Sequence, residues 1–281
     1  MNTSQKVIVE SIREKISGRR SFVRQMGMAS AGLGAFLATV ETADAQVTDV
    51  DILQFALNLE YLEAEFYTVA RTGKTIDQMG VGITGSGTTG ATTGGKQVTF
   101  IEGSTLAKSA DEIGADERAH VTLLRTALSG AGVMPVAKPA INLNALGAGF
   151  GSQEEFILLA RAFEDVGVSA YGAAAPLISS KAYLGVAARI LAAEAEHTGN
   201  LRLHATLYNV KTTALDPVDI LPPPSGTRFM SLDAQGLSAV RTPGQVLYIV
   251  YGGQPGAKTG AFFPGGMNGN LNTADATPAK P

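Results

Sequence analysis

The chain has 281 residues, with 22 Lys and Arg against 25 Asp and Glu and a formal net charge of −3. This balance argues against a nucleic-acid-binding protein, which would carry a strongly basic surface. Because the sequence contains no Cys, it forms no disulfide and offers no thiolate nucleophile, so a metal must be bound by His and carboxylate side chains.

The first 45 residues have the features of an export signal. The paired Arg19 and Arg20 resemble a twin-arginine motif, and a charge-free, weakly apolar stretch, 26–40, leads to Ala43-Asp44-Ala45. The stretch is short for a bilayer core of about 30 Å, and the small residues after it suit cleavage. We expect a bacterial twin-arginine signal peptide over residues 1–45, a periplasmic or secreted mature chain, and no membrane span after cleavage. An amphipathic arginine-containing helix is the alternative interpretation.

The mature part of the chain predicts four helices. Apolar residues recur at spacings of three and four over residues 50–71, 104–129, 152–177 and 180–208. Such helices bury their apolar stripes most simply against one another. We therefore predict an all-α fold, an antiparallel four-helix bundle over residues 46–209.

Two segments outside these helices differ in composition. Residues 72–103 are rich in Gly and Thr, which are poor helix formers, and are expected to form a long surface loop or a Thr-rich hairpin. Residues 210–281 are rich in Pro and Gly and are expected to form a C-terminal extension. Within it, residues 242–252 suit either a short helix, with Thr as the cap and Pro in the first turn, or a strand.

The candidate metal ligands lie on the predicted inner faces of the four helices. Two of the three His follow a Glu by three positions, a spacing that places both side chains on one helix face. The first and third helices each add one Glu on the face that also carries apolar residues. The resulting ligand set is Glu60, Glu117, His120, Glu164, Glu194 and His197.

The two halves of the predicted bundle repeat each other. Glu60 is followed by Tyr67 as Glu164 is followed by Tyr171, and each half then contains one Glu-x-x-His motif. In each case the Tyr lies two helical turns from the Glu on the same face. Tyr67 and Tyr171 are therefore expected either to hydrogen-bond the ligand carboxylates or to pack as aromatic side chains.

Four carboxylates in one bundle core would be costly without compensating positive charge. Two divalent cations would balance them, and an oxygen and nitrogen ligand set suits iron or manganese. Two Fe or Mn ions are therefore the expected cofactors, with dioxygen or peroxide as the reacting partner. The alternative is a metal-free network in which Arg125, Arg161 and Arg202 supply the counter-charges.

Three stretches, 53–67, 241–252 and 260–269, resemble the desiccation-related ferritin-like proteins of bacteria and plants. The resemblance extends over about residues 48–270. It implies a ferritin-like bundle whose di-metal centre, on the six residues above, reacts with dioxygen or peroxide. The long loop and the extension depart from cage-forming ferritins, which argues against a 24-subunit shell and leaves a smaller homo-oligomer open.

Three functions follow from these observations. The first is an exported protein that oxidises Fe(II) or consumes peroxide during oxidative or drying stress, that is, a ferroxidase- or peroxidase-type oxidoreductase. The second is a non-enzymatic stress or envelope scaffold with a structural or degenerate site, and the third is a di-manganese catalase.

Four further ionisable residues lie outside the predicted ligand set. Glu63 shares the inner face and is expected to be a shuttle, an alternative ligand or the partner of an Arg. Glu65 and Glu196 are expected on solvated outer faces. His204 is expected to be a histidine of the core or of the bundle end rather than a ligand.

Overall fold

Four long helices form the frame of the part of the chain that the computed structural model describes, residues 47–275, 277 and 279. They are α2 (Asp49–Thr72), α3 (Thr105–Gly130), α4 (Gln153–Ala174) and α5 (Lys181–Leu207). All four lie where the sequence predicts helices. The expected signal peptide, 1–45, lies outside the described residues. No helix within them is long and apolar enough to cross a membrane.

Polar caps fix where these helices begin. Thr48 and Asp51 form a capping box at the start of α2, and Ser104, Ser152 and Ser180 each accept a hydrogen bond from the backbone N–H three residues later. α4 runs on into a short 3-10 helix, η2 (Ala175–Leu177), which accounts for the predicted end of the third helix.

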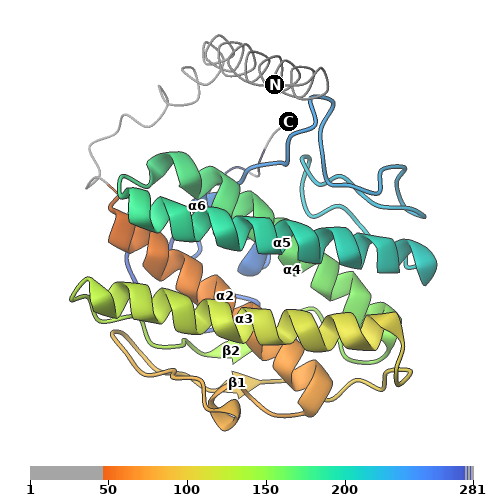
Figure 1. Ribbon diagram of the computed structural model, residues 1–281, viewed down its shortest axis with the longest axis horizontal. Coiled ribbons are helices and arrows are strands. Elements are labelled where there is room, and N and C mark those ends of the chain that lie inside the picture. Colours follow the sequence, from red (N-terminus) through yellow and green to blue (C-terminus); the bar gives the residue numbers. More distant parts are fainter. Residues whose placement is uncertain (1–46, 276, 278, 280–281) are drawn as a thin grey trace, which may run out of the picture. The chain divides into compact units, whose positions relative to one another are not determined.

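The helices pack as two pairs. α2 lies along α3 and α4 lies along α5, with the helices of each pair running in opposite directions (Figure 1). The pairs meet through contacts of α2 with α4 and of α3 with α5. Each pair corresponds to one copy of the sequence repeat, and the prediction of a mainly helical fold is confirmed.

α2 is enclosed on every side. All of its residues from Ile52 to Ala70 are buried, whereas a helix at a bundle surface would expose one face. The prediction that Glu65 is solvated is therefore wrong: its side chain is fully buried, lies 3.3 Å from Lys138 Nζ and accepts a hydrogen bond from the Ile76 N–H. Glu196 on α5 is exposed, as predicted.

The Gly/Thr loop covers the outer side of α2. It contains a 3-10 helix, η1 (Asp77–Met79), and a short strand, β1 (Thr92–Thr93), which pairs in parallel with β2 (Ile141–Asn142). The strand partner thus comes from the connection after α3, so a hairpin within the loop is not formed. A Cβ atom at Gly85 would clash with the carbonyl oxygen of Pro135, so glycine permits the close approach of these two segments.

The C-terminal extension packs against the bundle and closes the core on the other side. Residues 243–250 form the helix α6 (Pro243–Val250), which begins at a capping box between Thr242 and Gln245, so the helical alternative for this segment is the one observed. Phe262 and Phe263 are buried further along the extension. Burial of these aromatic rings stabilises the docked extension.

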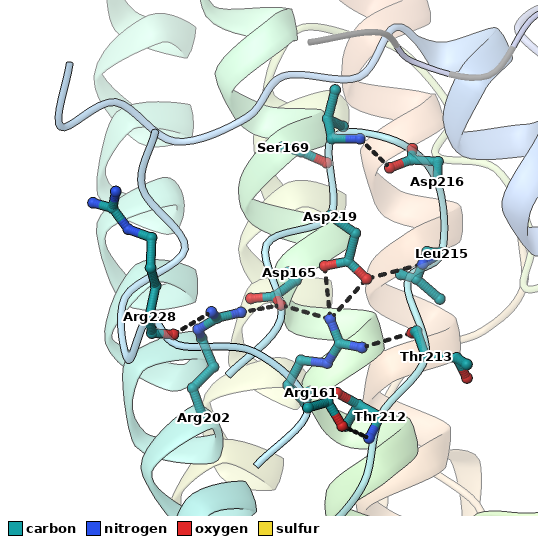
Figure 2. A network of polar contacts seen from close by, with 12 residues as sticks. Arg161, Asp165, Ser169, Arg202, Thr212, Thr213, Leu215, Asp216, Asp219 and Arg228 are labelled. Carbon is teal, nitrogen blue, oxygen red and sulfur yellow. Dashed lines mark hydrogen bonds and ion pairs between the residues drawn. The ribbon is translucent and has the colours of Figure 1, made fainter. Parts of the chain in front are cut away.

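Buried ion pairs attach the extension to α4 and α5. Arg161 and Arg202 both donate to Asp165, and Arg161 also donates to Asp219 of the extension at 2.8 Å (Figure 2). Arg202 further donates to the backbone carbonyl oxygens of Arg228 and Phe229. These arginines thus bind the extension, with Asp165 held between them.

The ion pair between Asp216 and Arg241 lies within the extension. Comparison with an exposed pair can test how strongly burial increases the cost of removing one partner. Both side chains are 2 % exposed, and the guanidinium donates to both carboxylate oxygens at 2.7 Å. We expect Asp216→Ala to lower the free energy of unfolding by about 3–5 kcal/mol, because it leaves a buried charge unpaired. The measurement is a urea unfolding curve.

The control is Asp111→Ala, which removes an equally bidentate partner of Arg71, but one whose own side chain is 59 % exposed. It should cost less than about 1 kcal/mol, because solvent screens exposed pairs. Equal losses in the two variants would show that burial does not strengthen the pair between Asp216 and Arg241.

Candidate metal centre

The six predicted ligands come together in the middle of the bundle. Each of the four long helices contributes one Glu to the cluster, and all four of these side chains are 0 % exposed. His120 is 8 % and His197 is 6 % exposed. The helical spacing of three thus places each Glu and its His on the same buried face.

The side chains form two overlapping groups that share two carboxylates. In each group, one ligand atom from every residue lies within 4.8 Å of the others. Glu60 and His120 belong to one group and Glu164 and His197 to the other, while Glu117 and Glu194 belong to both. Each group thus brings together carboxylate oxygens and one imidazole nitrogen that could hold a metal ion.

Both imidazole rings turn the same nitrogen toward the carboxylates. His120 Nδ1 lies 3.3 Å from Glu60 and from Glu117, and 3.5 Å from Glu194. His197 Nδ1 lies 3.0 Å from Glu117 and 3.2 Å from Glu164. The donor atoms therefore point inward to a common centre.

The two tyrosines connect the halves of the repeat reciprocally. Tyr67 on α2 donates a hydrogen bond to Glu164 on α4, and Tyr171 on α4 donates to Glu60 on α2, each at 2.5 Å. Each phenol thus fixes one oxygen of the carboxylate that belongs to the other helix pair. The second carboxylate oxygen is left facing the cluster.

No Lys or Arg within the described residues pairs with the four clustered glutamates. Arg161 and Arg202 bind Asp165 instead, and Arg125 donates to the Tyr61 hydroxyl and to a loop carbonyl oxygen. The three arginines of the metal-free alternative are therefore not counter-charges of the cluster. The two histidines are its nearest source of positive charge.

Several carboxylate oxygens of the cluster are buried without a hydrogen bond. They are Glu60 Oε2, Glu117 Oε1 and both oxygens of Glu194. Leaving such atoms unpaired costs free energy. Oxygen and imidazole nitrogen atoms are ligands that iron and manganese accept, so the donor set fits two such ions, which would satisfy these oxygens.

The pKa values reflect the crowding of negative charge. Burial, with repulsion from Glu164, raises the pKa of Glu117 to about 7. Burial and the charge of Glu117 raise the pKa of Glu194 well above its usual range. Burial alone would lower the pKa of His120, but its contacts with the glutamates outweigh burial and raise it strongly. The metal-free cluster therefore retains protons at neutral pH.

A fifth carboxylate, Glu63, lies beside the cluster and is 5 % exposed. Burial and the charge of Glu194 raise its pKa well above the usual range, and no Arg among residues 47–275 pairs with it. In the repeat its counterpart is Gly167, because Glu60 and Glu164 are offset by the same number of positions. A Cβ atom at Gly167 would lie 3.3 Å from Glu63 Oε1 and closer still to Glu194, so glycine leaves room for both carboxylates.

Asp116 is a site residue that the sequence analysis missed. Its carboxylate lies 3.3 Å from Nε2 of His197, a position from which it can fix the orientation of the ring. It also lines a polar pocket of about 250 Å³ with His197, Glu112 and Glu196. Asp116 belongs to neither spacing motif, so only the packing of α5 against α3 reveals its role.

His204 lies apart from the two ligand groups. It is 3 % exposed, its Nδ1 makes no hydrogen bond, and its ring contacts that of Tyr208. Burial lowers its pKa, which keeps the ring neutral. This is the core histidine that the sequence analysis expected.

A known protein family matches the segment that forms the four long helices. The sequence model described as a ferritin-like domain matches residues 48–207, more than half of the chain. This segment runs from the cap of α2 to the end of α5 and contains all six clustered residues. A search of curated proteins found no match. The chain belongs to the ferritin-like domain family.

Proposed function

We propose that this chain is a di-metal carboxylate protein that binds two Fe or Mn ions and oxidises Fe(II) with dioxygen or peroxide. The observation that carries the proposal is the set of four fully buried glutamates that only two histidines accompany as cationic partners. Two divalent cations would balance the four negative charges and occupy the oxygens that lack hydrogen bonds.

The overlap of the two groups supports a division of the ligands between the ions. Glu60 with His120, and Glu164 with His197, would each hold one ion, and Glu117 and Glu194 would bridge the two. Iron held by these residues would supply one electron per ion to an oxidant. The protein retains the geometry around it by burying the cluster within all four helices.

The surrounding residues orient the ligands and move protons. Tyr67 and Tyr171 each hold one oxygen of Glu164 and Glu60, which leaves the other oxygen directed inward. Asp116 contacts the outer nitrogen of His197. Glu117, whose pKa is about 7, gives up its proton when a cation binds.

The polar pocket supports a route for cations. It lies between α3 and α5, and Glu112, Asp116 and Glu196 place negative charge along its wall beside His197. Carboxylates of this kind attract divalent cations from solvent. A hydrated Fe(II) ion would therefore meet acidic side chains before it reaches the cluster.

Export and a role in stress belong to the same proposal. The paired Arg19 and Arg20 and the small residues that precede position 46 support twin-arginine export to the bacterial periplasm or outside the cell. The resemblance of residues 53–67, 241–252 and 260–269 to desiccation-related ferritin-like proteins supports protection during drying or oxidative stress.

Metal content tests the proposed site. We expect the purified protein, reconstituted anaerobically with Fe(II) or Mn(II), to hold close to two ions per chain by elemental analysis. Glu194→Gln should hold less than about one, because it removes a shared charged ligand. Glu154→Gln, at an exposed position on α4, is the control and should hold two.

The outcomes separate the functions. Two iron ions that are oxidised by dioxygen or peroxide support the ferroxidase or peroxidase function, and two manganese ions that release dioxygen from hydrogen peroxide support a catalase. A wild-type protein that cannot be loaded favours the scaffold. Full loading of Glu194→Gln would refute the ligand assignment.

Metal affinity should also depend on pH. Glu117 must lose its proton to bridge two ions, and its pKa is about 7. The proton competes with the metal below that pKa, so affinity falls as the pH is lowered from 8 to 6. On the acidic side of the pKa, the metal affinity is expected to fall by about tenfold per pH unit. Competition with a chelator of known affinity at pH 8, 7 and 6 measures it, and a constant affinity would contradict the assignment.

A further inference from the structure

A second pocket differs from the polar one in its chemistry. It has a volume of about 270 Å³ and is lined by α2, α4, α6 and the extension. Its walls are largely apolar, with side chains that include Leu59, Phe163, Val166 and Phe262. Glu63 is the one charged side chain among the residues that line it.

The inner end of this apolar pocket reaches the cluster. Glu63 and Gly167 both line it. A Cβ atom at Gly167 would clash with an oxygen of Glu194 and lie 3.3 Å from Glu63 Oε1, so the glycine brings both carboxylates close to this part of the pocket wall. In the other half of the repeat the equivalent position carries Glu63 itself. The pocket therefore adjoins the cluster through Glu63 on α2 and Gly167 on α4.

The volume of the pocket is much larger than that of dioxygen or hydrogen peroxide. A water molecule occupies about 30 Å³ in the liquid, whereas the pocket measures about 270 Å³. Dioxygen or hydrogen peroxide would leave most of its apolar wall without contact. A ligand that fills it must therefore carry an apolar group, whose burial favours binding.

The carboxyl group of Glu63 determines which polar group a ligand of this pocket can carry. Glu63 adjoins four further carboxylates, so an anionic head group would be repelled. A neutral O–H group can exchange a hydrogen bond with a carboxyl group in either of its protonation states. The ligand is therefore a neutral molecule with an apolar body and a hydroxylic end.

We propose that this pocket binds an alkyl hydroperoxide, with its alkyl group among the apolar side chains and its hydroperoxide end at Glu63. The inference rests on the proposed function and specifies the oxidant. In the reaction the O–O bond breaks, two protons are taken up, and an alcohol and water form. The two electrons would come from two Fe(II) ions held by the clustered residues, which would become Fe(III).

Binding can be measured without turnover on the whole chain, after chelation of metal and again after loading. The probe is 2-phenyl-2-propanol, the alcohol that corresponds to cumene hydroperoxide, followed by saturation-transfer NMR. We expect a dissociation constant below about 1 mM. The carboxylate of similar size, 2-methyl-2-phenylpropanoate, should not bind the metal-free protein. Absence of alcohol binding, or equal binding of the carboxylate, would overturn the inference.

Two variants fill the pocket from different walls. Ala162→Phe on α4 and Ala214→Phe in the extension place a ring in its volume, and both positions are at least partly exposed, so the core can remain intact. Each should weaken alcohol binding at least about tenfold while circular dichroism stays native. Ala188→Phe, exposed on α5 away from the pocket, should leave binding unchanged. Unchanged binding in both pocket variants would place the ligand elsewhere.

A kinetic comparison adds the oxidant itself. In the Fe(II)-loaded protein, cumene hydroperoxide should oxidise the iron at least about tenfold more slowly in Ala162→Phe than in Ala188→Phe. Equal rates would overturn the inference. A chain that binds the alcohol but holds no metal would instead refute the proposed function, so the two failures are distinguishable.

Discussion

Four carboxylates enclosed in one helical core govern the rest of this structure. Each would lose most of its hydration on burial, and together they repel one another. The bundle compensates with two inward imidazoles, two phenols and protons held on Glu117 and Glu194. These groups reduce the cost without removing it, because several oxygens still make no hydrogen bond. Bound cations would therefore lower the free-energy cost of burying these carboxylates.

The buried basic side chains outside the cluster form ion pairs with other carboxylates. Arg161 and Arg202 hold the extension through Asp165, Arg241 binds Asp216, and Lys138 neutralises Glu65 beneath the loop. Structural ion pairs are thus separated from the cluster, although some are on the same helices. This separation keeps fixed positive charge away from the centre, where it would compete with bound metal.

Helix spacing and the internal repeat were sufficient to predict the four helices and to select the residues that cluster, because both motifs repeat with the helical period. Their role as metal ligands remains a prediction. The burial of Glu65 and the contact of Asp116 with His197 could not be predicted. Both depend on segments that pack without periodicity: the Gly/Thr loop over α2, and α5 against α3. The repeat could have drawn attention to Gly167 as the counterpart of Glu63.

Asn268 in the extension connects three distant parts of the chain. It exchanges backbone hydrogen bonds with the Asn58 side chain of α2, and its own amide bonds Thr88 of the loop and the carbonyl oxygen of Ala137. The Asn58 contacts join residues 210 positions apart. Contacts of such sequence separation form slowly, since a long chain must close first. The helix pairs can assemble from local contacts, but the covering of α2 is completed only after residue 268 has been synthesised.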